Sequence, residues 1–379
     1  MRRSLLNNGG FAFYVHWPFC QSKCPYCDFN SHVAKTIDHD AWCTAYLLEI
    51  DKLQDYRKGE KLTSIYFGGG TPSTAAPSTI AAIIERIGKY WSLDGAEITL
   101  EANPTSVEAE KFKAFAHAGV NRISMGFQAF NDTDLKRLGR LHSVEESLKA
   151  LDIAQKYFDR TNFDLIYARQ DQTMDAWQIE LIEALKYAPD HLSLYQLTVE
   201  DGTAFADLYK HGKLRGLPSD DLAADIYDWT SETMQARGYN HYEVSNFARA
   251  GEESRHNLVY WRYGDYLGIG PGAHGRMWQD RKRIATAQTR NPNQWLLNKP
   301  EDEISELEPH EILEEYLMMS LRITEGASFD RLEKFGYEMP HKKMAELSKS
   351  NHLWMSNSHF GTTPEGRLLL NAILRELLI

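Results

Sequence analysis

Apolar and β-branched residues recur along the first half of the chain in short runs that alternate with longer amphipathic stretches. The short runs predict β-strands, and they cover Phe11–His16, Ser64–Phe67, Glu97–Leu100, Arg122–Phe127, Asn162–Ile166 and Leu192–Val199. The amphipathic stretches have the length of helices, and they fall at 39–57, 78–91, 106–118, 143–158 and 175–187.

Two of these stretches begin with residues that favour a helix start. Ser78 precedes a stripe of isoleucines that starts at Ile80, and Thr105-Ser106 precedes Phe112 and Phe115 on one face. Strands that alternate with helices predict a parallel sheet, because parallel neighbours need crossover connections. Six units are too few for a closed eight-stranded barrel. We therefore expect an α/β fold, a partial, six-unit parallel βα barrel with its site at the C-terminal ends of the strands.

The pattern changes beyond about residue 300. Glu308–Arg322 predicts a long amphipathic helix, 328–335 and 340–349 predict shorter ones, His352–Thr363 reads as a hairpin, and Pro364–Leu378 predicts a last helix. Helices followed by a small hairpin resemble a winged-helix module. The polar segment Arg290–Pro300 is the expected boundary. The predicted units are a barrel over 8–240, a connecting segment over 241–299 and a helical, winged-helix-like domain over 300–379.

Three cysteines, Cys20, Cys24 and Cys27, lie close together near the N-terminus. Thiols crowded in this way form a disulfide, a zinc site or an iron–sulfur cluster, or they are three unrelated reduced thiols. An odd number argues against a closed disulfide framework. Structural zinc normally takes four protein ligands, and no second cysteine pair follows. An iron–sulfur cluster also normally takes four cysteines, so three would leave one iron without a protein ligand.

Polar residues and a glycine run stand where the predicted strands end. They are Tyr14 and His16, Gly68-Gly69-Gly70-Thr71-Pro72, Glu101, Gln128 and Asp164. Any one of them could be a capping or turn residue, but their recurrence at successive strand ends favours a common site. Consecutive glycines let a backbone approach a ligand with its amide groups free. By contrast, Gly270-Pro-Gly-Ala-His-Gly275 matches the dinucleotide-binding pattern only formally, since Pro271 interrupts it and no βαβ unit follows.

The cysteine spacing, with Tyr26 before Cys27, resembles the signature of radical S-adenosylmethionine (SAM) enzymes. A narrower resemblance, to the oxygen-independent coproporphyrinogen dehydrogenase family, covers about the first 240 residues and resumes near residue 256. The motifs that carry it are Tyr14-Val-His-Trp-Pro-Phe-Cys, Gly68–Ser73, Leu100-Glu-Ala-Asn-Pro104, Ser124-Met-Gly-Phe-Gln128, Leu138-Gly-Arg140-Leu-His and Asp164-Leu-Ile-Tyr.

This resemblance implies a [4Fe–4S] cluster on Cys20, Cys24 and Cys27, with SAM beside it. The implied SAM contacts are Tyr14, Tyr26, Gly69, Gly70, Thr71, Glu101, Gln128, Arg140 and Asp164. Carboxylates suit the ribose hydroxyls and the sulfonium side, and Arg140 suits the methionine carboxylate. The family usually continues Asp-Leu-Ile-Tyr with Gly-Leu-Pro, whereas this chain has Ala168-Arg169-Gln170.

Two branches of the family differ at positions that this chain displays. The dehydrogenase branch has a further cysteine where this chain has Phe29, and a longer N-terminal segment than the ten residues that precede the first strand here. The heme-chaperone branch, of HemW type, has the Cys27–Asn30 sequence and a His-Asn-x-x-Tyr-Trp motif, present as His256, Asn257, Tyr260 and Trp261. Both features favour the chaperone branch.

A neutral imidazole is a good ligand for heme iron, and tyrosine and tryptophan offer apolar faces to a porphyrin. His256 is therefore the candidate heme ligand, with His241 and His274 as rivals. The alternative is that Asn257 and Tyr260 simply tie the connecting segment to the barrel.

The expected function is that of a heme chaperone, which binds heme, a [4Fe–4S] cluster and SAM and gives heme to an unidentified acceptor protein. A coproporphyrinogen III dehydrogenase and a radical SAM enzyme with another substrate are the alternatives.

Composition changes this picture little. The net charge of −11 over 379 residues argues against nonspecific nucleic-acid binding by a general basic surface. We expect no secretory signal and no membrane span, which leaves peripheral contact with a membrane open. A cluster with an exposed iron needs a reducing compartment, so cytoplasm is the expectation. Cys43, the fourth cysteine, lies in an apolar helical stretch and reads as a buried small hydrophobe.

Overall fold

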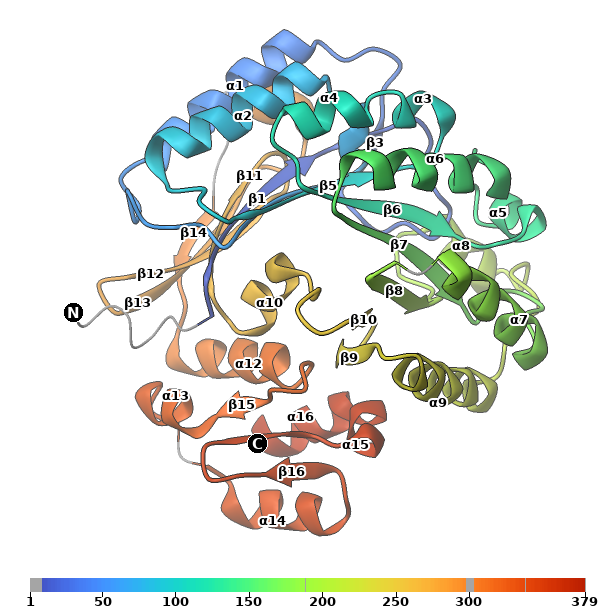
Figure 1. Cartoon of the computed structure of the whole chain (residues 1–379). Coiled ribbons are helices and arrows are strands. Elements are labelled where there is room, and N and C mark those ends of the chain that lie inside the picture. The colour runs from blue at the N-terminus through green and yellow to red at the C-terminus, as the bar shows by residue number, and fades with distance from the viewer. Residues whose placement is uncertain (1–8, 188, 298–302, 338, 379) are drawn as a thin grey trace.

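A computed structural model of the chain describes residues 9–187, 189–297, 303–337 and 339–378. Its main feature is a curved sheet of twelve strands in the order β14-β13-β12-β11-β1-β4-β5-β6-β7-β8-β10-β9. Figure 1 shows the sheet as an arch, with helices over its convex side and the short helix α10 (Arg255–Trp261) on its concave side.

The centre of the sheet is parallel. Its strands are β1 (Phe11–Trp17), β4 (Ser64–Gly69), β5 (Glu97–Ala102), β6 (Arg122–Gln128), β7 (Arg160–Tyr167) and β8 (His191–Gln196), and β11 (Asp265–Ile269) pairs in parallel with the other side of β1. The first six are the strands that the sequence predicts, each within a few residues. The predicted partial parallel barrel is confirmed, and its strands end together at one edge, as parallel strands must.

Helices cover the convex face because each presents one apolar stripe to it. In α2, Ile80, Ile83, Ile84 and Ile87 are all buried, as the isoleucine spacing predicts. The helices of the barrel are α1 (His39–Lys52), α2 (Pro77–Tyr90), α3 (Ser106–Ala109), α4 (Phe112–His117), α5 (Asp132–Arg137), α6 (Val144–Tyr157), α7 (Met174–Ala184), α8 (Ala204–Lys210) and α9 (Asp220–Ala236). The predicted helix 106–118 is thus two short helices.

The segment 241–299 is more than a connection. It forms antiparallel strands on both flanks of the sheet, the helix α10 on its concave side and a further helix that packs on α1. The strands are β9 (Asn240–Glu243), β10 (Asn246–Ala248), β12 (His274–Gln279) and β13 (Lys282–Ala287), and the further helix is α11 (Pro292–Leu296). Trp295 of α11 is buried and stacks on Trp42 at 5.4 Å between ring centroids, so the polar segment expected as a boundary is fastened to the barrel.

The C-terminal unit contains helices and a small sheet, in the arrangement that the sequence predicts. Its elements are α12 (Pro309–Ser320), β15 (Ala327–Ser328), α13 (Phe329–Lys334), α14 (His341–Lys349), β16 (Leu353–Met355), β17 (His359–Thr362), α15 (Pro364–Leu368) and α16 (Leu370–Leu378). Tyr316, Leu317 and Phe360 belong to its own apolar core. However, β14 (Glu303–Glu306) pairs with β13, so the barrel sheet continues past residue 300 and this unit begins with α12.

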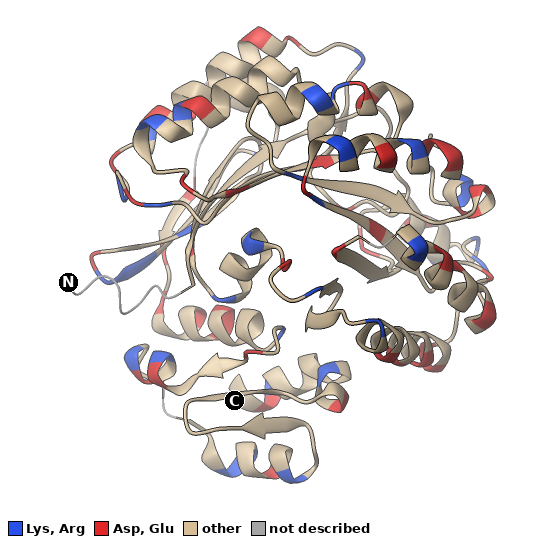
Figure 2. Cartoon of the chain, viewed as in Figure 1, with Lys and Arg blue, Asp and Glu red and all other residues tan. Residues whose placement is uncertain are grey.

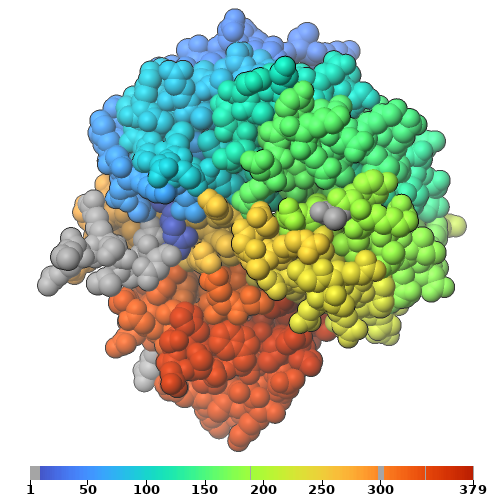
Figure 3. Space-filling view, in the orientation of Figure 1, coloured from blue at the N-terminus to red at the C-terminus, as the bar shows by residue number. Residues whose placement is uncertain are grey.

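The C-terminal unit packs below the barrel, where Figure 3 shows its orange and red atoms against the yellow and green ones. Charged residues of both signs lie on the outer helices, and α9 is mainly acidic (Figure 2). Among the described residues, no helix is both long enough and apolar enough to cross a membrane.

Candidate functional site

The three cysteines of the N-terminal motif border one cavity of about 360 Å³ at the C-terminal edge of the parallel strands. Cys20 ends the short strand β2 (Phe19–Cys20), which follows β1, and a backbone hydrogen bond from Cys27 N to Cys24 O (3.1 Å) turns the loop back on itself. All three thiols are half-buried and none is in a disulfide. Cys43 is also half-buried, rather than buried as predicted, and it lies on α1 away from this cavity.

Two polar side chains donate hydrogen bonds to the cysteine sulfurs. Thr71 Oγ1 donates to Cys20 Sγ, and the Arg140 guanidinium donates through Nη1 to Cys24 Sγ, both at 3.4 Å. Burial raises the pKa of the Cys20 and Cys27 thiols, so an iron centre would have to supply the positive charge that keeps them as thiolates. Three converging thiols with hydrogen-bond donors behind them fit an iron–sulfur cluster.

Eight of the nine residues predicted to contact SAM line this same cavity. They are Tyr26, Gly69, Gly70, Thr71, Glu101, Gln128, Arg140 and Asp164. The ninth, Tyr14, points into an adjoining cavity of about 290 Å³, which Gly69 and Glu101 also line. The strand ends therefore bring together residues that lie up to 150 positions apart in the chain, from 14 to 164.

Two backbone amides of the glycine-rich segment hold the cysteine strand. Gly70 N donates to Trp17 O (2.7 Å) and Thr71 N donates to Phe19 O (2.8 Å), so these amides hold the cysteine strand and are not free for a ligand. An added Cβ at Gly70 would lie 2.7 Å from Phe19 O. Gly69 has φ +112°, and a Cβ there would lie 2.6 Å from the ring of His16. The run is glycine-rich because the cysteine loop packs directly on it.

Two half-buried carboxylates face the cavity. Glu101 accepts a hydrogen bond from the Tyr66 hydroxyl (2.7 Å), and Asp164 accepts one from Asn162 Nδ2 (3.2 Å). Loss of contact with water raises the pKa of Glu101 to about 7, with a further rise from Asp164, and it raises the pKa of Asp164 to about 6. Half-buried carboxylates of this kind favour a cationic ligand or one that donates hydrogen bonds.

Arg140 stands between the cysteines and the strand ends. Besides Cys24, its guanidinium donates to Asn103 Oδ1 (2.6 Å) and to Gly126 O (2.9 Å), and its buried Nε has no hydrogen-bond partner among the described residues. A Cβ at Gly126 would lie 2.7 Å from Gln128 Nε2, so a side chain there would displace the Gln128 amide. The sequence prediction missed Asn103, Gly126 and Tyr66 as site residues, although the first two stand inside the quoted motifs.

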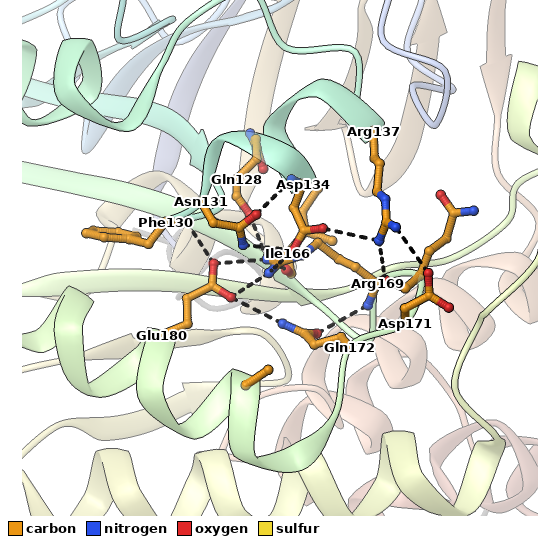
Figure 4. Close-up of polar contacts among 12 residues, drawn as sticks. Gln128, Phe130, Asn131, Asp134, Arg137, Ile166, Arg169, Asp171, Gln172 and Glu180 are labelled. Carbon is orange, nitrogen blue, oxygen red and sulfur yellow. Dashed lines mark hydrogen bonds and ion pairs between the residues drawn. The ribbon is translucent and has the colours of Figure 1, made fainter.

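The unusual segment Ala168-Arg169-Gln170 follows β7 shortly after Ile166, which lines the cavity, and Figure 4 shows Arg169 among its polar partners. Arg169 is 3% exposed and forms ion pairs with Glu180 and Asp134. It also donates to Ile166 O (2.6 Å) and to Gln128 O (3.4 Å), where the backbone of Gln128 has φ +73°. Ala168 itself has φ +55°, at the position where the family usually has glycine. The loop therefore differs chemically from the usual one and still supports the ends of β6 and β7.

The candidate heme residues are spread over α10 and do not share one surface. His256 is 3% exposed, its Nδ1 pairs with Ser64 Oγ (2.9 Å), and its ring stacks on Tyr66 at 4.7 Å. Its Nε2 is buried without a partner among the described residues. Burial lowers the pKa of His256 to about 3, so the ring is neutral. A heme iron could reach this ring only if α10 or the tyrosines moved.

The other members of the motif have separate neighbours. Asn257 N donates the N-cap hydrogen bond to Ser254 Oγ (3.3 Å), and the Tyr260 ring lies 4.2 Å from that of Tyr266. Trp261 is covered by the guanidinium of Arg322, at 4.8 Å from the ring centroid.

The two rival histidines differ from each other. His241 is half-buried, with Nε2 facing Val244 O (3.0 Å) and Nδ1 facing Arg367 Nη1 (3.1 Å). His274 is exposed at the start of β12 and lines the adjoining cavity next to Tyr14. Of the three candidates, His274 alone presents its ring to solvent.

Comparison with known proteins agrees with this arrangement. Residues 14–181 match the radical SAM superfamily. The solved structure of the coproporphyrinogen III oxidase HemN from Escherichia coli, described as a radical SAM enzyme, covers 99% of this chain and is itself covered over 92%, with a TM-score of 0.80 at 22% sequence identity. Fold and sequence therefore define a radical SAM protein.

Relatives that match along most of the chain identify a narrower family within the radical SAM proteins. The chain is 36% identical to the heme chaperone HemW of Escherichia coli, over 96% of this chain and 97% of that protein. It is 37% identical to the mitochondrial radical S-adenosyl methionine domain-containing protein 1 of Danio rerio, over 97% of this chain and 87% of that protein. The chain belongs to the family that these two proteins share, the HemW-type branch of the coproporphyrinogen dehydrogenase-like radical SAM proteins.

Proposed function

We propose that this protein is a heme chaperone that binds a [4Fe–4S] cluster, SAM and heme, and transfers heme to an acceptor protein. The observation that carries the cofactor part is the convergence of three half-buried thiols with eight predicted SAM contacts on one cavity. The heme part rests on the family and on Phe29, which stands where the dehydrogenase branch has a cysteine.

Cys20, Cys24 and Cys27 would hold the cluster, and three protein ligands would leave one iron open beside the SAM contacts. The chain's own residues then have distinct tasks. Glu101 and Asp164 would accept hydrogen bonds from the ribose and balance the sulfonium charge, since both are half-buried and line the cavity. Arg140 would neutralise a carboxylate while it keeps its hydrogen bond to Cys24.

The Ser64–His256–Tyr66 group has a supporting position under the cavity. Tyr66 connects it to the site, because its ring stacks on His256 and its hydroxyl donates to Glu101. His256 as the heme ligand stays a prediction, and it requires a movement of α10. A reducing compartment such as the cytoplasm suits a cluster with an open iron, and we propose that compartment on chemical grounds.

The test combines heme titration with a product assay on the anaerobically reconstituted protein. We expect a Soret band that saturates with added heme, and no protoporphyrinogen IX from coproporphyrinogen III in the presence of SAM and a reductant. Porphyrinogen turnover would place the chain with the dehydrogenases. Failure to bind heme, with cluster and SAM in place, would favour a radical SAM enzyme for another substrate.

A further inference from the structure

The cavity next to the SAM site has the chemistry of a porphyrin site. It measures about 290 Å³ and opens between the cysteine loop and the start of β12. Phe29, Gly69 and Glu101 border both this cavity and the larger one that holds the cysteines. A ligand in the smaller cavity would therefore lie beside SAM and share Gly69 and Glu101 with it.

The hydrogen bonds of Asn30 hold two segments that line this cavity together. Asn30 Nδ2 donates to Pro271 O (2.8 Å) and to Arg290 O (2.9 Å), while its backbone carbonyl oxygen pairs with His16 Nε2 (2.9 Å). These contacts fasten the cysteine loop to the turn that leads into His274. That turn is the Gly270–Gly275 segment that resembled a dinucleotide motif, and it joins β11 to β12 with positive φ at Gly270 and Gly272. Gly272 must stay small because a Cβ would lie 2.7 Å from Asn30 Nδ2.

His274 is the group in this cavity that can bind iron from outside. Its side chain is exposed, and no hydrogen bond or ion pair engages it among the described residues. Partial burial, with Arg276 and Arg290 nearby, lowers the pKa of His274, so the ring is neutral at pH 7 and has a free electron pair. His16, the other imidazole of the cavity, is buried and both its ring nitrogens are engaged, by Tyr14 and Asn30.

The surroundings of His274 match the remaining parts of a heme. The Phe29 ring is 61% exposed and offers an apolar face to a porphyrin. Arg290 is exposed, and no ion pair holds its guanidinium among the described residues, so it can bind a propionate. His274 also borders a second cavity of about 490 Å³ between β12–β13 and α12. Its lining combines the apolar Ala285, Ala287 and Met318 with the carboxylates of Glu303, Glu311, Glu314 and Glu315, so the apolar face at Phe29 is the side that suits a porphyrin.

The exposed position of His274 suits a heme that the protein must pass on. A heme that must pass to another protein needs an iron ligand that solvent and a partner can reach, whereas the His256 ring is closed in by tyrosines. We infer that heme binds at the mouth of this cavity, with His274 as an iron ligand, Phe29 against the porphyrin and Arg290 at a propionate. This inference rests on the proposed function, and it places the cargo within reach of the cluster loop through Asn30.

The test is heme titration of reconstituted full-length protein and three histidine variants. His274→Ala should weaken heme binding at least about tenfold, which corresponds to about 1.4 kcal/mol, and should change the Soret band. Added imidazole should restore the wild-type spectrum in that variant, an effect that a structural defect would not give. His117→Ala, at an exposed histidine of α4 on the outer layer, should behave as wild type.

Arg290→Gln should weaken heme binding less than His274→Ala, and it should lose its effect when heme dimethyl ester replaces heme. Cluster content and SAM binding, measured on the same preparations, should remain at wild-type values. Unchanged heme binding in His274→Ala beside normal wild-type binding overturns this site. Loss of binding in His256→Ala alone also overturns it and moves the ligand into the barrel. Absence of heme binding by the wild type overturns the proposed function and this site together.

Discussion

The guanidinium of Arg169 and the carboxylate of Glu180 form a buried ion pair, 2.5 Å from Nη2 to Oε2, directly behind the ends of β6 and β7. Both side chains are less than a tenth exposed. Asp134 on α5 shares the same Nη2 at 2.9 Å, and Gln172 Nε2 donates to Glu180 as well (Figure 4). Arg169 and Gln170 stand where the usual family sequence has Leu-Pro, so in this chain charged and polar contacts hold the loop.

Replacing Arg169 should therefore lower the free energy of unfolding strongly. Arg169→Leu leaves the Glu180 carboxylate buried without its cation, and we expect the free energy of unfolding to fall by about 3–5 kcal/mol. Urea unfolding measures it. The double variant Arg169→Leu/Glu180→Leu should recover much of the loss, because no unpaired charge remains. Arg137→Ala is the control at an exposed site: it removes the pair with Asp171, a longer contact with Asp134 and a hydrogen bond to Gln170 O, and it should cost less than about 1 kcal/mol. Equal losses in the two arginine variants would contradict this interpretation of the buried pair.

The residue before Arg169 offers a substitution that should stabilise the protein. Ala168 has φ +55°, a left-handed conformation that glycine adopts freely and alanine does not. We expect Ala168→Gly to raise the free energy of unfolding by about 1 kcal/mol, in the same urea assay. Ala45→Gly in the middle of α1 should do the opposite, with a loss of about 1 kcal/mol. A loss in both variants would mean that the backbone at Ala168 is unstrained.

The predicted cluster uses three of the four cysteines as ligands and leaves out the fourth. Replacement of Cys20, Cys24 or Cys27 by Ala should abolish the [4Fe–4S] cluster, whereas Cys43→Ala should not, because Cys43 lies on α1 away from the cavity. The cluster content of each variant is measured as iron content and absorbance after anaerobic reconstitution. Gly70→Ala should also lower cluster content, since its Cβ would push on Phe19 O of the cysteine strand. Gly88→Ala in α2 is the control, as its Cβ would meet only the flexible side chain of Leu93 at 3.3 Å. Full cluster content in any of the three cysteine variants would remove that thiol from the ligand set.

SAM binding should depend on pH through Glu101. Burial raises the pKa of this carboxyl to about 7, so the fraction that is ionised falls as the pH drops through 7. If the ionised form binds SAM, the affinity should be about tenfold lower at pH 6 than well above pH 7. Calorimetry at several pH values measures it. Glu101→Gln should bind SAM weakly and lose most of this dependence, while the cluster remains. A wild-type affinity that is flat from pH 6 to 8 would show that Glu101 does not titrate in the binding step.

The sequence predicted the parallel core well because its signals are local. Each strand of β1 and β4–β8 is an apolar run between amphipathic helices, and each polar residue at a strand end follows such a run. The cysteine spacing and the glycine run are also contiguous in the chain. These features needed no knowledge of tertiary contacts, which is why β2 and the strand ends meet as expected.

The features that the sequence did not predict depend on contacts between distant segments of the chain. Nothing in the apolar pattern shows that β11 pairs with β1, that β14 joins β13, or that α10 lies on the concave side of the sheet. The sequence also does not reveal that the Gly70 amide donates to Trp17 O and so holds the cysteine strand. The motif around His256 is distinctive, but the burial of the His256 ring cannot be read from that motif.

The central claim is that this chain carries heme and releases it to a protein. The direct measurement is to mix the heme-loaded, cluster-containing protein with an apo-heme protein, separate the two by size and record which fraction carries the Soret band. We predict that heme stays with the chain in buffer alone and moves to the acceptor on mixing. The transfer should be faster than the spontaneous dissociation of heme from the chain without an acceptor. Heme that fails to bind, or that leaves at the same rate with and without the acceptor, would contradict the claim.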